Sequence, residues 1–128
     1  MKKNLLFVLL GLLLLVSCSN KPGDAFLNYA NKAVDGNYDG FAEGFCRKGQ
    51  KLTAAEDSLN RVMMQDYKYY LDEKYGGLQA VEVVRDSIYD DGMHADIRVS
   101  LHFKDATVEE TEYVMSKVDG KWLIELAL

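Results

Sequence analysis

The stretch M-H-A-D-I-R-V-S-L-H-F, residues 93–103, alternates between apolar and polar side chains. The apolar set is Ala95, Ile97, Val99, Leu101 and Phe103. The polar set is His94, Asp96, Arg98, Ser100 and His102. Successive side chains of a β-strand point to opposite faces, so this pattern predicts a strand with one buried face and one solvated face. The sheet that contains it should be covered on one side only.

Three further strands are expected around this one. Asp90-Asp91-Gly92 is a hairpin turn signal, and a segment rich in valine and isoleucine, 78–89, precedes it. Turns at 104–106 and at Asp119-Gly120 lead to strands over 107–118 and 121–128. Because short connections join antiparallel neighbours, we expect a four-stranded antiparallel sheet.

Two helical segments are expected ahead of the sheet. Asp24 can cap a helix with apolar residues three or four apart, and Gly36 ends it. A short second piece carries Phe41 and Phe45, and residues 47–52 are expected to form a loop.

A third and longest helix begins at Thr53-Ala54-Ala55-Glu56. This is a capping box, in which the Thr53 side chain and the Glu56 side chain each satisfy a backbone amide at the helix start. The helix should end near Tyr75, because Gly76-Gly77 permits a left-handed exit. Its expected buried stripe is Ala55, Leu59, Val62, Met63, Tyr67, Tyr70 and Leu71.

Helices followed by a four-stranded meander are typical of an α+β domain. Three motifs carry a further resemblance: V-D-G-N-Y-D-G-F at 34–41, D-G-M-H-A-D-I at 91–97 and V-D-G-K-W-L-I at 118–124. The chain resembles the nuclear transport factor two-like, or cystatin-like, superfamily, which implies a long helix across a curved sheet in a half-open cone. Within it, the chain is most similar to small bacterial lipoproteins grouped under a domain of unknown function. It is shorter than the superfamily's enzymes, whose additional elements enlarge the pocket.

The first residues have the features of an export signal. Lys2 and Lys3 precede an apolar run from Leu5 to Val16 that is broken only by Gly11. This run of about 12 residues is shorter than the ~20 that a membrane-spanning helix needs. It has no polar face either, so it does not fit a core helix. We therefore interpret residues 1–17 as a signal peptide that is removed.

Leu15-Val16-Ser17-Cys18 resembles the bacterial lipobox, which implies that Cys18 is acylated and becomes the first residue of the mature chain. Acyl chains anchor through burial of their CH₂ groups, at about 0.8 kcal/mol each. Residues 18–23 would then form a lipidated tether, and residues 24–128 a single α+β domain. The absence of an aspartate after Cys18 predicts the outer membrane, with the domain facing the periplasm.

The net charge of the chain limits the kinds of partner that we expect. The whole chain has 15 basic and 20 acidic side chains, and loss of Lys2 and Lys3 would leave 13 against 20, a formal charge of −7. An acidic domain is repelled by nucleic acid and by anionic lipid heads, so neither is expected as a partner. Lipidation would leave Cys46 without a disulfide partner, and it fits a small buried residue better than a reactive thiol.

No common catalytic signature is present. The chain has no phosphate-binding glycine loop, no His-Glu-x-x-His, no Gly-x-Ser-x-Gly and no Cys-x-x-Cys. Asp66 falls within the expected apolar stripe of the long helix. It could face a cavity as a general base with a raised pKa, or pair with a basic residue at the rim. No cofactor is expected.

Two other groups of residues could bind a ligand. His94 and Asp96 have a spacing that can hold a metal, but two ligands are too few and His102 lies too far along the strand, so no metal site is predicted. A cone lined by aromatic and imidazole groups could hold a small apolar ligand, or these rings could fill the core. The candidate ligand-binding residues are Tyr67, Tyr69, Tyr70, His102, Tyr113 and Trp122.

Three functions remain open from the sequence. The first is a lipid-anchored, non-catalytic binding module of the cell envelope, which holds a small molecule or an envelope protein. The second is a small enzyme that uses Asp66 as its base. The third is a structural subunit that forms a homodimer through the polar face of its sheet.

Overall fold

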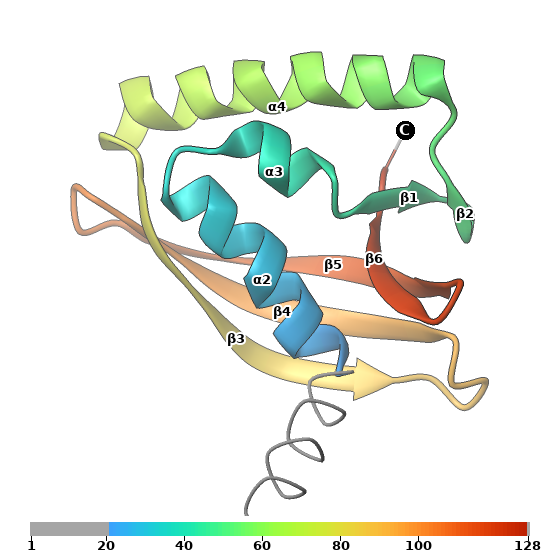
Figure 1. The fold of residues 1–128 in the computed structure, drawn as a ribbon. Coiled ribbons are helices and arrows are strands. Elements are labelled where there is room, and N and C mark those ends of the chain that lie inside the picture. The colour runs from blue at the N-terminus through green and yellow to red at the C-terminus, as the bar shows by residue number, and fades with distance from the viewer. Residues whose placement is uncertain (1–20, 128) are drawn as a thin grey trace, which may run out of the picture.

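The computed structural model describes residues 21–127, so the predicted signal peptide and Cys18 lie outside the described residues. Helices cover one face of a curved sheet, and the long helix α4 crosses one end of the cone (Figure 1). The helices are α2 (Pro22–Val34), α3 (Tyr38–Ala42) and α4 (Ala54–Tyr75). The strands are β1 (Phe45–Arg47), β2 (Gln50–Lys51), β3 (Leu78–Ile88), β4 (His94–Phe103), β5 (Val108–Val118) and β6 (Lys121–Glu125).

The sheet has six strands in the order β2-β1-β6-β5-β4-β3. All neighbours are antiparallel except β1 and β6, which are parallel. The predicted α+β class and curved sheet are therefore confirmed, while the expected count of four strands is wrong. The predicted loop over 47–52 and the helical piece before it contain β1 and β2. These strands are too short for a period-two pattern, and β1 is held by its pairing with β6.

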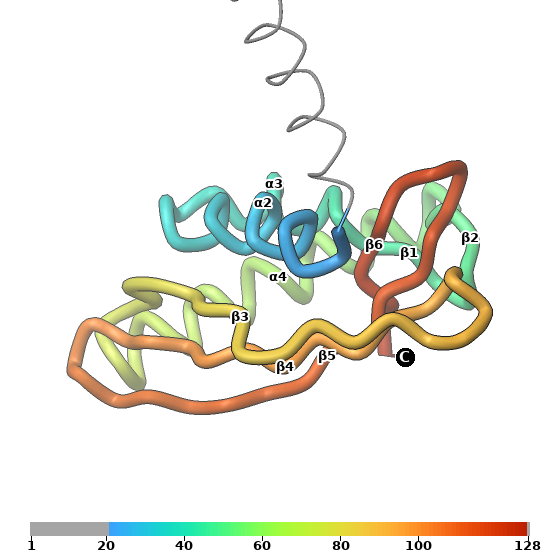
Figure 2. Tube along the Cα trace, turned by 90° about the horizontal axis from the view of Figure 1, so that it is seen from below, coloured from blue at the N-terminus to red at the C-terminus, as the bar shows by residue number. Residues whose placement is uncertain are grey.

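The alternation of β4 produces the core as predicted. Ala95, Ile97 and Val99 are fully buried on the inner face. Register shifts in β3 after Leu78 and after Val83 bend the edge of the sheet. Figure 2 shows α2 and α3 in one layer and β3, β4 and β5 in the other, with β6, β1 and β2 curling up toward the helices. A single hydrophobic cluster joins the three helices to β1, β3, β4, β5 and β6, so these elements share one core.

Helix α2 starts earlier than predicted. It begins at Pro22, whose fixed φ suits the first helical position, and Asp24 lies within the first turn instead of capping it. The Gly23 amide donates to a carboxylate oxygen of Asp86 on β3 at 2.8 Å. A Cβ on Gly23 would approach that oxygen to 2.6 Å, so the Asp86 side chain would have to shift to accommodate a larger residue.

Helix α4 has the predicted ends but a different buried face. Thr53 and Glu56 form both hydrogen bonds of the capping box, and Gly76 ends the helix with φ of 78°. The expected stripe is wrong, because Leu59 is 49% exposed and Val62 is 59% exposed. Asn60 is buried instead and donates to the Ala42 carbonyl at 3.3 Å.

The inward face of α4 keeps Met63, Tyr67 and Leu71 of the expected stripe and adds three residues outside it, one of which is polar. Its members are Asn60, Met63, Met64, Tyr67, Leu71 and Tyr75. A buried polar side chain breaks apolar periodicity, so counting apolar residues alone rotates the predicted face around the helix axis.

Glu125 on β6 holds the turn between β1 and β2. Its carboxylate accepts from the amides of Lys48 and Gly49 at 2.7 and 2.8 Å, from the Ser116 hydroxyl at 2.5 Å and from the Cys46 thiol at 3.4 Å. Lys48 has φ of 52°, a left-handed conformation that is unusual for a residue other than glycine. Burial raises the pKa of Glu125, but these hydrogen bonds outweigh burial and leave the pKa below its ordinary value.

Glu125→Gln is expected to lower the free energy of unfolding by about 1–3 kcal/mol at neutral pH, because the turn amides lose a charged acceptor. The folded-state pKa is lowered, so the contribution is complete above the unfolded pKa of about 4.3 and is lost as the pH falls through the folded value. Urea unfolding from about pH 7 to about pH 3 should show the difference between parent and variant shrinking.

The matched control is Glu82→Gln, because Glu82 is exposed on β3 and its substitution should leave the unfolding free energy nearly unchanged. A difference for Glu125→Gln that stays constant across the pH range would contradict a role for the charge.

Candidate functional site

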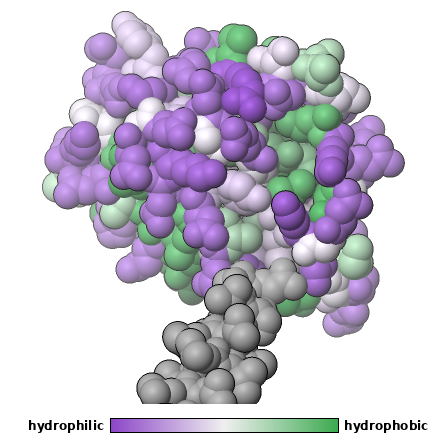
Figure 3. Space-filling view, viewed as in Figure 1, coloured by the Kyte–Doolittle hydropathy of each residue, from purple (hydrophilic) through white to green (hydrophobic). Residues whose placement is uncertain are grey.

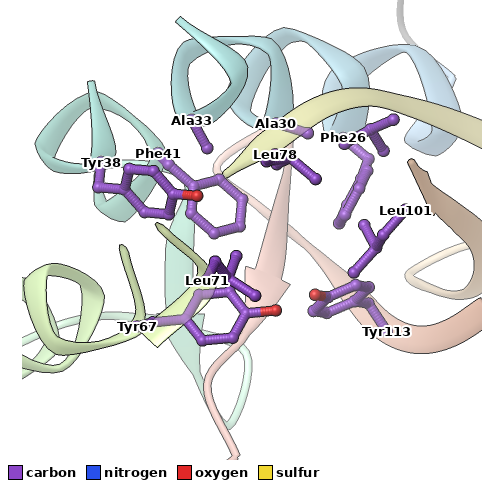
Figure 4. A pocket seen from close by; sticks show the side chains of 11 residues that line it. Phe26, Ala30, Ala33, Tyr38, Phe41, Tyr67, Leu71, Leu78, Leu101 and Tyr113 are labelled. Carbon is purple, nitrogen blue, oxygen red and sulfur yellow. The ribbon is translucent and has the colours of Figure 1, made fainter. Parts of the chain in front are cut away.

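The inner face of the cone surrounds a small hollow. Its walls come from α2, α3, α4, β3, β4 and β5 (Figure 4). The lining is apolar apart from three tyrosine hydroxyls. Its residues are Phe26, Ala30, Ala33, Tyr38, Phe41, Tyr67, Leu71, Leu78, Val81, Leu101 and Tyr113. The cavity measures about 20 Å³, which is room for about one water molecule.

Contacts between aromatic rings join the helices of the cone to one another and to the sheet. The rings of Phe26 and Tyr113 are tilted with centroids 4.9 Å apart, so α2 packs directly on β5. The Tyr38 ring meets Tyr67 edge to face at 6.5 Å and Phe41 at 6.4 Å, which joins α3 to α4. Offset and edge-to-face geometries of this kind stabilise a core beyond simple burial. The rings therefore fill most of the space that a ligand would need.

Tyr38, Tyr67 and Tyr113 direct their hydroxyls into the hollow, and those of Tyr67 and Tyr113 point toward each other (Figure 4). Burial raises the pKa of all three, that of Tyr38 to about 12, and the neighbouring hydroxyls raise the values of Tyr38 and Tyr113 further. Within residues 21–127 none of these hydroxyls hydrogen-bonds to a protein group. They remain protonated at neutral pH, so they can orient a water molecule but cannot act as a base.

The predicted ligand-binding residues are not brought together. Tyr67 and Tyr113 line the hollow. Tyr69 is 69% exposed and Tyr70 is 48% exposed, so both lie on the outside of α4. His102 is on the opposite face of β4, and Trp122 is buried in the core with the Lys117 amino group 5.7 Å from its ring centre.

Tyr38 also lines the hollow, and it was not among the ligand-binding residues predicted from the sequence, although the residues around it indicate its position. Asn37 caps α3 by accepting from the Gly40 amide at 2.9 Å, which places Tyr38 and Phe41 one turn apart on the same side. A capping residue followed by two aromatic residues three apart predicts a short amphipathic turn. That signal could have added Tyr38 to the candidates.

Asp66 does not lie within the cone. It is exposed on the outer side of α4, so the prediction that it falls in the buried stripe is wrong. The error has the same origin as the misplaced stripe, since Asn60 occupies the inward position instead. No carboxylate lines the hollow, and the cavity has no room for a substrate beside one.

A second polar cluster closes the end of α4. The Tyr75 hydroxyl donates to Glu109 on β5, and the Tyr75 ring stacks on Phe103 at 4.0 Å. Lys74 donates to the Tyr70 hydroxyl at 2.9 Å and lies over the rings of Tyr70 and Tyr75 at 5.4 and 5.2 Å. The hydrogen bonds to these hydroxyls raise the pKa of Lys74. The cluster is satisfied by its own members and joins α4 to the sheet.

The polar face of β4 forms local pairs. His94 Nδ1 lies 2.6 Å from a carboxylate oxygen of Asp91, and Asp96 accepts from the Tyr89 hydroxyl at 2.6 Å. Arg98 forms a salt bridge of 2.7 Å with Glu112 on β5. Among residues 21–127, no three His, Cys, Asp or Glu side chains are grouped closely enough to hold a metal ion.

Cys46 is structural. It is fully buried, and burial, followed by the nearby Glu125 carboxylate, raises its pKa to about 12. The thiolate is the nucleophilic form, so Cys46 is unreactive near neutral pH. No helix of the described chain is both long and apolar enough to cross a bilayer.

A long helix across the open end of a curved sheet is the α+β architecture that the resemblance to the NTF2-like superfamily implies. A crystal structure of a candidate NTF2-like transpeptidase from Campylobacter jejuni superposes with a TM-score of 0.64. The two are 17% identical, and the match covers 83% of this chain and 98% of that one. At this identity the likeness shows the fold alone. Residues 16–125 match the family described as "Domain of unknown function (DUF4878)", and the chain belongs to that family.

Two other solved structures resemble the chain less. One is a de novo designed protein with a curved β-sheet, with a TM-score of 0.47, 19% identity and coverage of 76% of this chain and 86% of that one. The other is the intermembrane space region of the chloroplast protein ARC6, with a TM-score of 0.39, 10% identity and coverage of 86% and 91%. Comparison with curated protein sequences finds no match. The predicted fold and the predicted membership in a family of domains of unknown function are thus confirmed, and lipidation stays a prediction.

Tyr67→Phe and Tyr113→Phe are expected to change the free energy of unfolding by less than about 1 kcal/mol, because neither hydroxyl has a hydrogen-bond partner on the described chain. Leu71→Ala should lower it by about 2–5 kcal/mol, because it opens a larger void in the same wall. Urea unfolding of the three variants compares them directly. A loss above about 2 kcal/mol for either phenylalanine variant would mean that the hydroxyls hold a buried polar network.

Proposed function

We propose that this chain is a lipid-anchored, non-catalytic binding module of the cell envelope, held in the outer membrane with its domain facing the periplasm, and that it binds a protein partner through its outer surface. The observation that carries this proposal is the filled cone. A cavity of about 20 Å³ lined by hydrocarbon and protonated tyrosines has no room for a small-molecule ligand.

An enzymatic role receives no support from the described residues. Asp66 is on the outside of α4, and the Cys46 thiol is buried against Glu125 with a raised pKa. A transpeptidase needs an activated nucleophile that is open to its substrate. The function named for the Campylobacter jejuni protein is therefore not carried over to this chain.

The lipid anchor is supported by the sequence around Cys18. The apolar run, the small residue Ser17 and the cysteine follow one another as in a lipobox. The described domain begins at Pro22, so three residues separate it from Cys18. At most about 3.6 Å per residue, the tether keeps the start of α2 within roughly 15 Å of the acylated residue.

Protein extracted from membranes is expected to begin at Cys18 and to carry acyl groups there. Cys18→Ala should abolish acylation and removal of residues 1–17, because the thiol is the acceptor. Mass spectrometry of the N-terminal peptide measures both events. Cys46→Ala is the matched control, since it changes the other of the two cysteines, and it should leave the anchor intact. A mature chain that starts at Met1, or one with a free thiol at Cys18, would overturn the anchored role.

A further inference from the structure

An exposed stripe runs along the outside of α4. Its members are spaced by four, three, four, three and four residues, and we call this set the outer seam. Three of its members are large apolar side chains that are exposed, at 49% for Leu59, 59% for Val62 and 69% for Tyr69. The adjoining Tyr70 is 48% exposed. The outer seam consists of Ala55, Leu59, Val62, Asp66, Tyr69 and Glu73.

The outer seam lies away from the core. At about 100° per residue, its centre is roughly 140° around the helix from the inward face of Asn60, Tyr67 and Leu71. The flank toward α3 is already occupied, because Arg61 pairs with Asp57 at 3.0 Å and donates to the Asp39 carbonyl. Within residues 21–127, α3 and the sheet therefore leave the seam open. In Figure 3, hydrophobic residues appear at the upper edge of a mostly hydrophilic face, where α4 lies.

The spacing of the seam indicates what could cover it. Apolar residues that alternate at three and four positions form the a and d positions of a heptad, which pack against a second helix. Leu59, Val62, Tyr69 and Tyr70 together present roughly a few hundred Å² of apolar surface. This is about as much as the largest apolar patch on a typical monomer. Helix α4 has 22 residues, so it is about 33 Å long and can support three heptads.

The charges of the seam indicate which charge its partner should carry. Glu56 and Asp72 beside the seam are paired with Arg47 and Lys68, at 2.7 and 2.8 Å. Asp66 and Glu73 within the seam form no hydrogen bond or ion pair inside residues 21–127. A carboxylate that is covered by a partner needs a cation, because an unpaired buried charge is costly. A second copy of this chain would bring further carboxylates against Asp66, so a basic partner fits better.

The position of α4 agrees with such a role. The start of α2, where the predicted tether arrives, lies at the bottom of Figure 1, and α4 lies along the top. An anchored chain would therefore present the outer seam away from its own attachment point. We propose that the outer seam docks an amphipathic helix of another envelope protein that carries a lysine or arginine opposite Asp66. This proposal rests on the binding function proposed above and names its partner's chemistry.

The test uses residues 21–127 and a labelled synthetic peptide of about three heptads, with leucine at the a and d positions and lysine at the central a position. A matched peptide has glutamate in place of that lysine. Fluorescence anisotropy should show the lysine peptide binding at least about tenfold more tightly than the glutamate peptide. Asp66→Lys should reverse this preference, because a lysine at position 66 attracts the glutamate of one peptide and repels the lysine of the other.

Two further variants separate docking from loss of folding. Val62→Glu should weaken binding of the lysine peptide by about tenfold or more, because it places a charge in the apolar part of the seam. Val84→Glu is the matched control on β3, where the parent side chain is 50% exposed, and it should bind like the parent. Circular dichroism with a thermal melt establishes that each variant is folded.

Three outcomes would overturn the proposal. They are no binding of either peptide at about 100 μM, equal affinity for both peptides, and sedimentation that shows a dimer which Val62→Glu dissociates, since the occupant would then be a second copy. Failure of the peptide test leaves acylation of Cys18 unaffected, and a free thiol at Cys18 leaves peptide binding unaffected. The two proposals can therefore fail separately.

Discussion

The structure depends on keeping the inner face of β4 away from water. Ala95, Ile97 and Val99 are fully buried there, and burying a large aliphatic side chain contributes about 1.5–3 kcal/mol. Helix α2 lies across this face, and its small residues Ala30 and Ala33 let it approach closely. This close approach stabilises the fold, and it also fills the space inside the cone that could otherwise hold a ligand.

A filled cone shifts recognition to the outside of the molecule. The hollow beneath the helices is enclosed by Phe26, Tyr38 and Phe41, whose rings pack against one another or against the tyrosines of α4 and β5. On the convex side, Arg98 is paired with Glu112, and Val108 and Val114 are exposed on the neighbouring strand positions. The outside of α4 combines four exposed large apolar side chains with the carboxylates of Asp66 and Glu73, which lack a partner on the described chain.

The features that the sequence predicts well are those set by local chemistry. The alternation of β4, the capping box at Thr53 and the glycine exit at Gly76 each depend on neighbouring residues, and all three are present. Predictions that needed knowledge of distant contacts failed. Asn60 is buried because the Ala42 carbonyl accepts from it, and β1 is a strand because β6 lies beside it. Since the orientation of α4 depends on Asn60, the same missing information misplaced Asp66, Tyr69 and Tyr70.

The contact between Gly23 and Asp86 gives the domain a mechanical property. The first turn of α2 is fastened to the edge strand β3 by a hydrogen bond of 2.8 Å. Tension that arrives through the N-terminal segment enters the fold at Pro22 and meets this fastening before it reaches the aromatic core. The load is thereby shared with β3, nine of whose eleven residues are paired along β4, so the bonds of the ladder resist it together. Detaching the helix end by force would require either breaking this bond or drawing a whole strand along with it.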